Sequence, residues 1–256
     1  ISAETDDEFL FECFVDHPAV SEITDLANSK MILLGSTGIG KTAILRMIER
    51  SCNHCECIEL LEMSMNYISN RDTINFLRSI DVDLSLFFQA LWRHVLCVEF
   101  IKMAVPVQTE EKSKFFITRI YNSYMRDQRK EKFIKFVREN ENKFWNTMDQ
   151  TVLEITENLT RQVHAELGSE VSKAAAKAGY AKSLSAEKRE HFQQRARKFV
   201  DSQLLSDLSH VINGLSEYMK DNREKYYILI DRLDEHWIDP ELKFELIQAL
   251  FEAVKG

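Results

Sequence analysis

Proline and glycine are scarce in this sequence, with three and seven among 256 residues. Both residues interrupt helices, so their scarcity predicts long uninterrupted helices. An excess of positive charge is also lacking, because the net charge is −8, and this argues against a general nucleic-acid coat protein. With 45% hydrophobic residues, the composition is typical of a soluble globular protein that can bury one sizeable core or two modest ones.

The start of the given sequence has no resemblance to a signal peptide. The first residue is Ile1 rather than methionine, and nothing near it resembles the charged and apolar segments of a secretory signal. The expected location is therefore cytoplasmic. Five cysteines, an odd number without a secretory context, are expected to stay reduced.

Three of the cysteines lie close together in the sequence. Cys52, Cys55 and Cys57 form a C-x-x-C-x-C cluster around His54. Thiolates and imidazole are the usual ligands of zinc, so one hypothesis is a zinc site. No second pair is present to close a tetrahedral site except His54 itself or the remote Cys97. The alternative interpretation is a turn that leads into a strand.

What the sequence does contain is a glycine-rich loop between an apolar run and a helical pattern. Residues 31–46 read MILLGSTGIGKTAILR, which contains the pattern G-x-x-x-x-G-K-[ST]. Residues 31–34 predict a short strand covered on both faces, and residues 43–50 predict a helix with one apolar face. By composition the bare pattern arises by chance in roughly one chain in a hundred of this length. Three of only seven glycines fall within it, which favours a phosphate-binding loop over an ordinary strand, turn and helix.

Each residue type in this loop has a chemical reason. Glycines allow backbone N–H groups to turn inward around an anion, and the dipole of the following helix points at the phosphates. Lys41 would reach the β- and γ-phosphates, and the Thr42 hydroxyl would ligate Mg²⁺. The predicted nucleotide-binding residues are Gly35, Ser36, Thr37, Gly38, Ile39, Gly40, Lys41, Thr42 and Ala43.

A second motif follows near the end of the sequence. Residues 226–235 read YYILIDRLDE, an apolar run that ends in carboxylates, as a central parallel strand does at the carboxyl edge of its sheet. Asp231 is predicted to hold Mg²⁺, directly or through water. Asp234 and Glu235 are predicted to orient the attacking water or accept its proton, so that they and Lys41 form the catalytic set. The alternative is an acid-rich surface turn after an ordinary strand.

The region between the two motifs is predicted to be helical. Residues 83–105 are apolar nearly all round, but Arg93, His94, Glu99 and Lys102 interrupt them, so a buried core helix is expected rather than a membrane span. Aromatic residues recur at helical spacing through 114–167, as in a protein core. Residues 170–198 are basic, which fits a solvated helix face or a contact with nucleic acid or an acidic partner.

The sequence as a whole predicts an α/β fold, a P-loop NTPase with a parallel sheet and a large all-helical insertion. Residues 1–82 and 223–256 are expected to form the nucleotide-binding core, and residues 83–222 the insertion. Strands are expected at 31–34, 57–63 and 226–231. A last helix is expected to begin at Asp239-Pro240-Glu241 and to have the apolar face Phe244, Ile247, Leu250, Phe251 and Val254.

At these residues a family resemblance appears. GSTGIGKT together with ILIDRLDE resembles the Walker A and Walker B motifs of the STAND class of signal-transducing P-loop ATPases. FECFVD before the loop, LFFQALWRHVL after it and YYILIDRLDEHW resemble a bacterial family of P-loop ATPases in signalling and anti-phage defence. Arg232 departs from the small residue that the NACHT ATPases often have there.

The resemblance implies bound ATP and Mg²⁺, slow hydrolysis that serves as a conformational switch, and a larger protein that forms oligomers or acts on an effector. It also implies a further strand between the loop strand and the acidic strand, so the chain is expected to continue past Gly256. A guanine-reading N/T-K-x-D motif and an L-S-G-G-Q motif are lacking, which argues against a Ras-like GTPase and an ABC ATPase. Two rivals remain, an ATP-binding scaffold without hydrolysis and a nucleic-acid-dependent motor.

Overall fold

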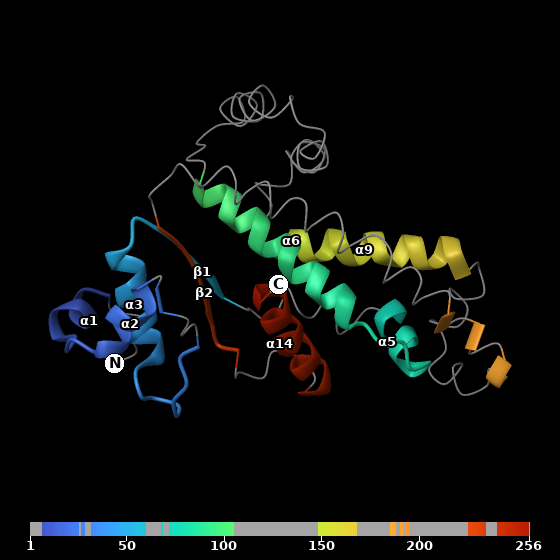
Figure 1. The fold of residues 1–256 in the computed structure, drawn as a ribbon, viewed down its shortest axis with the longest axis horizontal. Coiled ribbons are helices and arrows are strands. Elements are labelled where there is room, and N and C mark those ends of the chain that lie inside the picture. The colour runs from blue at the N-terminus through green and yellow to red at the C-terminus, as the bar shows by residue number, and fades with distance from the viewer. Residues whose placement is uncertain are drawn as a thin grey trace, which may run out of the picture. The chain divides into compact units, whose positions relative to one another are not determined.

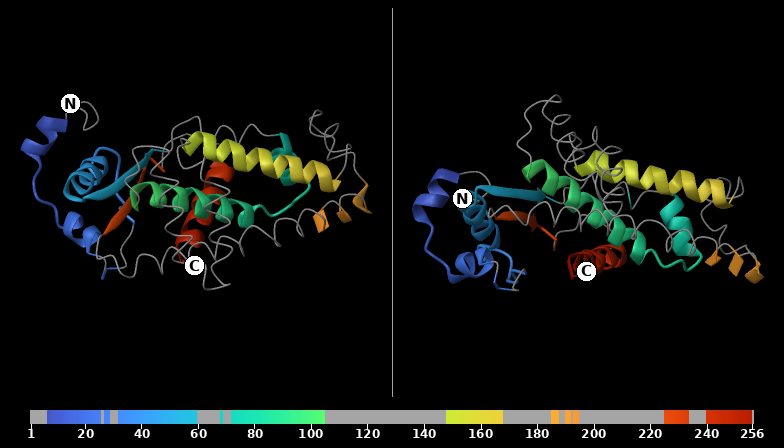
Figure 2. Two further views of the ribbon diagram at one scale, coloured as in Figure 1. Left: turned by 90° about the horizontal axis from the view of Figure 1, so that it is seen from above. Right: turned by 45° about the horizontal axis from the view of Figure 1, so that its top comes forward.

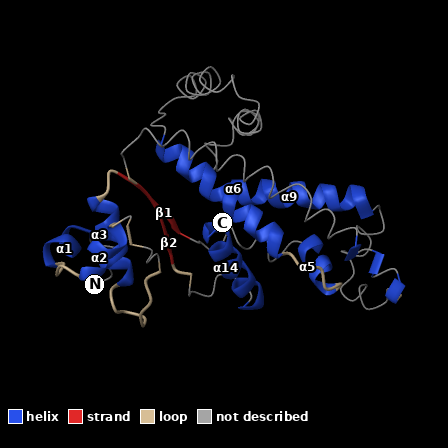
Figure 3. Cartoon of the chain, viewed as in Figure 1, coloured by secondary structure: helices blue, strands red, loops and turns tan. Residues whose placement is uncertain are grey.

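The computed structural model describes the following residues: 7–25, 27–28, 32–59, 68, 72–104, 148–167, 185–187, 190–191, 193–194, 225–233 and 240–255. The chain divides into two compact units. The first unit comprises residues 1–59 and 224–233, and the second comprises residues 60–223 and 234–256. Figure 3 shows that the described part of the chain is mostly helical and that β1 and β2 are its strands.

The described part of the first unit contains three helices and a pair of parallel strands. Its elements, in chain order, are α1 (Asp7–Cys13), α2 (Pro18–Thr24), α3 (Lys41–Ser51), β1 (His54–Glu59) and β2 (Tyr226–Asp231). In the sheet, His54 lies opposite Tyr226 and Glu59 opposite Asp231. Both strands therefore end level with each other, and each ends on an acidic residue. Within this unit α3 packs against both strands (Figure 1).

The core of the first unit lies between α3 and the sheet. Ile44 and Ile48 of α3 and Leu229 of β2 are buried there and contact one another. Tyr227 of β2 fixes α2 to the sheet, because its hydroxyl donates a 2.7 Å hydrogen bond to the carbonyl oxygen of Thr24. Through these contacts both α2 and α3 are attached to β2.

The second unit is helical throughout its described part. It contains α5 (Asp72–Ser79), α6 (Ser85–Ala104), α9 (Met148–Leu167) and α14 (Pro240–Lys255). Helix α6 packs against α9 and α14, and the views in Figure 2 show α14 crossing it. Most side chains in the first four turns of α6 are buried, with Phe87, Phe88 and Val98 fully so. The expectation of a buried core helix is confirmed.

The expected strand at residues 31–34 is wrong for the residues that the structure describes. Residues 32–34 have no regular secondary structure, and the side chains of Ile32 and Leu34 are 58% and 87% exposed. A strand is stabilised by hydrogen bonds to its neighbours. Among the described residues β2 pairs with β1 alone, so this apolar run has no strand beside it. The second strand begins at His54, three residues earlier than expected, and residues 60–63 lie outside the described part.

The expected apolar face of α14 is also wrong in part. Phe244 and Val254 are 69% and 47% exposed, whereas the buried residues are Leu242, Leu246, Ala249, Leu250 and Ala253. The helix has apolar residues on more than one face, and the face that includes the small residues Ala249 and Ala253 allows the closest approach to α6. By its contacts, helix α14 belongs to the second compact unit.

Candidate functional site

The glycine loop, residues 35–40, owes its conformation to its glycines. Gly38 and Gly40 have φ angles of 83° and 95°, in the left-handed region where a side chain is strained. A Cβ atom on Gly35 would lie 2.6 Å from Cγ2 of Ile39, so Ile39 would have to move. Gly40 is the N-cap of α3 and supplies no side-chain cap, so the helix start is available to an anion.

Lys41 is the first residue of α3, and its side chain turns back over the loop. Its ammonium Nζ donates hydrogen bonds of 2.9 Å and 3.2 Å to the carbonyl oxygens of Gly35 and Ser36. The loop residues Ser36, Thr37 and Ile39 are exposed. The loop is therefore open to solvent, and the ammonium group is held beside its backbone.

Thr42 and Asp231 are brought together although they lie 189 positions apart. The Thr42 hydroxyl Oγ1 donates a 3.0 Å hydrogen bond to Oδ2 of Asp231. The other carboxylate oxygen, Oδ1, accepts a 2.8 Å bond from the backbone N–H of Arg232. Both oxygens of Asp231 are thus fixed at the point where β2 ends beside the first turn of α3.

This pair of oxygens suits a magnesium ion. Mg²⁺ takes hard oxygen ligands in an octahedron at about 2.0–2.1 Å, so two adjacent ligands are about 3 Å apart. The Oγ1 of Thr42 and the Oδ2 of Asp231 are 3.0 Å apart. Both side chains are half-buried, so these two oxygens would hold the ion where water or phosphate could also reach it.

Two predicted catalytic residues, Asp234 and Glu235, lie outside the described residues. The remaining member of that set, Lys41, lies at the glycine loop, and Ala43 is half-buried in the first turn of α3. Sequence reasoning missed the left-handed backbone of Arg232, which has a φ of 60°. Nothing in the arginine side chain signals this conformation, because the residues that favour it are glycine and asparagine.

The cysteine cluster packs against the core of the first unit. Cys52, Cys55 and Cys57 are half-buried and contact the group formed by Ile44, Ile48 and Leu229. Within the described ranges, histidine, cysteine and acidic residues nowhere gather in a group of three or more that could hold a metal ion. Burial raises the pKa of the Cys55 thiol to about 12, with smaller contributions from the neighbouring Cys52 and Glu49.

The raised thiol pKa predicts slow alkylation of Cys55. At about pH 8, a thiol with a pKa of about 12 is ionised in only about one molecule in ten thousand, and the thiolate is the reactive form. The exposed Cys13 serves as the internal comparison. We expect iodoacetamide to modify Cys13 well before Cys55, as measured by peptide mass spectrometry, and the difference to disappear in denaturant. Equal rates in the folded protein would contradict this account of the cluster.

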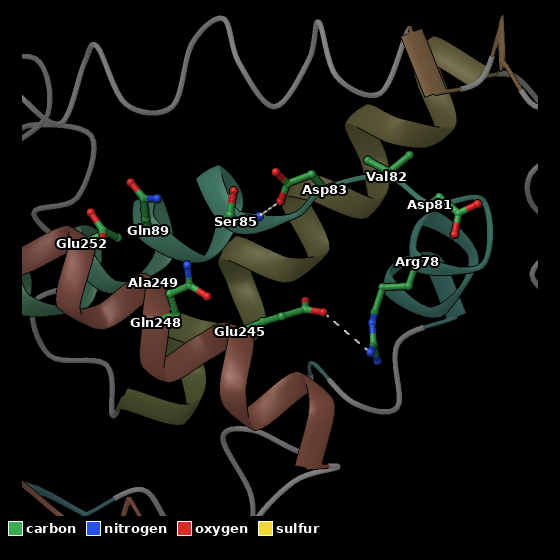
Figure 4. Close-up of a pocket in the computed structure, with 10 residues that line it drawn as sticks. All are labelled: Arg78, Asp81, Val82, Asp83, Ser85, Gln89, Glu245, Gln248, Ala249 and Glu252. Carbon is green, nitrogen blue, oxygen red and sulfur yellow. Dashed lines mark hydrogen bonds and ion pairs between the residues drawn. The ribbon is translucent and has the colours of Figure 1, made fainter.

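A cavity of about 520 Å³ lies within the helical unit (Figure 4). Its lining comes from the segment 78–89 and from α14. Arg78 extends from α5 towards α14, where its guanidinium pairs with Glu241 at 3.2 Å and with Glu245 at 3.7 Å. Asp83 accepts a 2.8 Å hydrogen bond from the Ser85 N–H at the start of α6. None of the residues predicted to bind nucleotide or metal lines this cavity.

Comparisons with protein-family models, curated proteins and solved structures give no match. The function is therefore inferred from the residues of this chain. No helix in the described part of the chain combines the length and the apolar character needed to cross a membrane.

Proposed function

We propose that this chain is an ATP-binding P-loop ATPase module that uses Mg²⁺. The observation that supports it most is the 3.0 Å hydrogen bond between Thr42 and Asp231. In this class of enzyme, the hydroxyl after the loop lysine and the aspartate at the end of a strand serve the same ion. A glycine loop that matched the pattern by chance has no reason to meet an aspartate 189 positions away.

Each residue has a distinct task in this proposal. The N–H groups of the glycine loop and the start of α3 bind the phosphates, and Lys41 exchanges its loop carbonyls for phosphate oxygens. Thr42 and Asp231 hold Mg²⁺, which when bound neutralises charge on the phosphates. Asp234 or Glu235 orients the attacking water. No arginine finger is assigned within this chain, and a neighbouring subunit is a source for one.

The biological role is proposed from the family resemblance alone. Slow hydrolysis would serve as a conformational switch in a larger, oligomeric bacterial protein of signalling or anti-phage defence. That protein would be cytoplasmic and would act through further copies of itself or an effector partner.

Measuring phosphate release distinguishes ATP hydrolysis from the alternative, an ATP-binding scaffold that does not hydrolyse ATP. We expect the wild type to release phosphate from ATP in the presence of Mg²⁺. An Asp234→Asn/Glu235→Gln variant should be slower by about 100-fold or more, because a positioned acid or base contributes about that much, and it should still bind ATP.

The matched control carries the same change of charge elsewhere, in Glu241→Gln/Glu252→Gln on α14, and should keep the wild-type rate. A wild type that binds ATP and releases no phosphate would favour the scaffold. Turnover that appears only with added DNA would favour the motor.

A further inference from the structure

The backbone of Arg232 is in an unfavourable conformation beside the proposed metal ligand. Its φ angle is 60°, and within the described residues Asp81 is the other non-glycine residue with a positive φ. Arginine has no side-chain property that favours the left-handed region, so the surrounding structure imposes it. The same residue donates its backbone N–H to Oδ1 of Asp231 at 2.8 Å.

These two features are mechanically coupled. The peptide between residues 231 and 232 is planar, so it turns as a unit about the bonds on either side of it. Such a turn changes ψ of Asp231 and φ of Arg232 together. A turn of this peptide that brings φ of Arg232 to a negative value also moves the Arg232 N–H away from the Asp231 carboxylate. In such a turn of the peptide, the left-handed conformation and the hydrogen bond to Oδ1 are lost together.

The bond to Oδ1 decides how the carboxylate faces Thr42. With Oδ1 held by the Arg232 N–H, the plane of the carboxylate is fixed and Oδ2 lies 3.0 Å from the Thr42 hydroxyl. Without that bond the carboxylate gains freedom to rotate about its Cβ–Cγ bond. Groups that orient a metal ligand in this way typically contribute a factor of about 10–100 to metal affinity.

We propose that Arg232 is a positioning residue that acts through its backbone: its left-handed turn presents the N–H that orients Asp231 for Mg²⁺. This inference rests on the proposed function, because it assigns a positioning residue to that same site. The side chain of Arg232 is not required for this role, but a residue that tolerates a positive φ is.

The test compares residues that tolerate the left-handed region with residues that do not. Arg232→Gly and Arg232→Asn tolerate it, Arg232→Val retains the N–H but disfavours the conformation, and Arg232→Pro removes both. For each full-length variant, the affinity for a fluorescent ATP analogue is measured in Mg²⁺ and in EDTA. The ratio of the two affinities isolates the contribution of the metal.

We expect the glycine and asparagine variants to retain the wild-type ratio within about threefold. The valine and proline variants should lose about tenfold or more of it. Their affinity in EDTA should be unchanged, because the glycine loop and Lys41 are intact. Circular dichroism verifies folding, and if the proline variant does not fold, the valine and glycine pair carries the comparison.

The possible failures differ from one another. A wild type that binds no ATP overturns both the proposed function and this inference. If the wild type binds ATP and Arg232→Val keeps the wild-type ratio of the affinities in Mg²⁺ and in EDTA, the inference alone is overturned. A loss in Arg232→Gly as large as in Arg232→Val also overturns it, because the side chain would then be the active part.

Discussion

Lys41→Ala is expected to abolish detectable ATP binding while leaving the protein folded. Loss of a charged partner from a phosphate site reduces affinity by about 100-fold or more. In the structure the lysine ammonium donates hydrogen bonds to the loop carbonyls of Gly35 and Ser36, and both bonds are exposed to solvent. Water can replace it at those carbonyls, so the midpoint of thermal unfolding should change little.

The control for this prediction is another lysine of the same unit. Lys225 also donates to a backbone carbonyl, that of Thr24 at 3.4 Å, and Lys225→Ala removes the same charge away from the glycine loop. Calorimetric titration with ATP should therefore show normal binding for Lys225→Ala and none for Lys41→Ala. Equal binding by the two variants would refute the assignment of the loop.

The parts of the fold that could be predicted are those that local sequence determines. Pro240 was expected at the first position of a helix, where its missing N–H costs nothing, and α14 begins there. The length and apolar character of 83–105 predicted α6, which spans Ser85–Ala104. The apolar run at 226–231 predicted β2 at the same residues.

The parts that could not be predicted depend on contacts between distant segments. Residues 31–34 have the composition of a buried strand, but a strand needs partners, and the sequence does not state which segments pair. The face of α14 was uncertain for a similar reason. Its apolar residues surround the helix, and the partner α6 decides which of them are buried.

In the candidate site, too, some features follow from local sequence and others depend on contacts between distant segments. The glycines, Lys41 and Thr42 are close in the sequence, so their pattern is readable without a structure. The meeting of Thr42 with Asp231 was inferred because the two motifs occur together in a known class of enzyme. The left-handed turn at Arg232 had no sequence signal, because an arginine side chain has no property that favours a positive φ.

The largest expected effect on stability is at Trp92, which joins α6 to α14. Its side chain is 1% exposed, and its indole Nε1 donates a 2.9 Å hydrogen bond to the carbonyl oxygen of Leu246, whose side chain is fully buried. Truncation of a buried tryptophan to alanine removes a large apolar surface and leaves a cavity between the two helices. We expect Trp92→Ala to lower the free energy of unfolding of the helical unit by about 3–5 kcal/mol.

Two further variants separate the packing of the indole from its hydrogen bond. Trp92→Phe retains most of the volume and loses the N–H, so it should cost only about 1–2 kcal/mol. Phe244→Ala removes an aromatic ring that is 69% exposed on α14, and it should change the free energy of unfolding by less than about 0.5 kcal/mol. Urea unfolding followed by circular dichroism measures all three, and the transition of the helical unit is compared among them. If Trp92→Ala unfolds at the same urea concentration as Phe244→Ala, the indole of Trp92 is not buried between α6 and α14. The packing of α14 against α6 would then be incorrect.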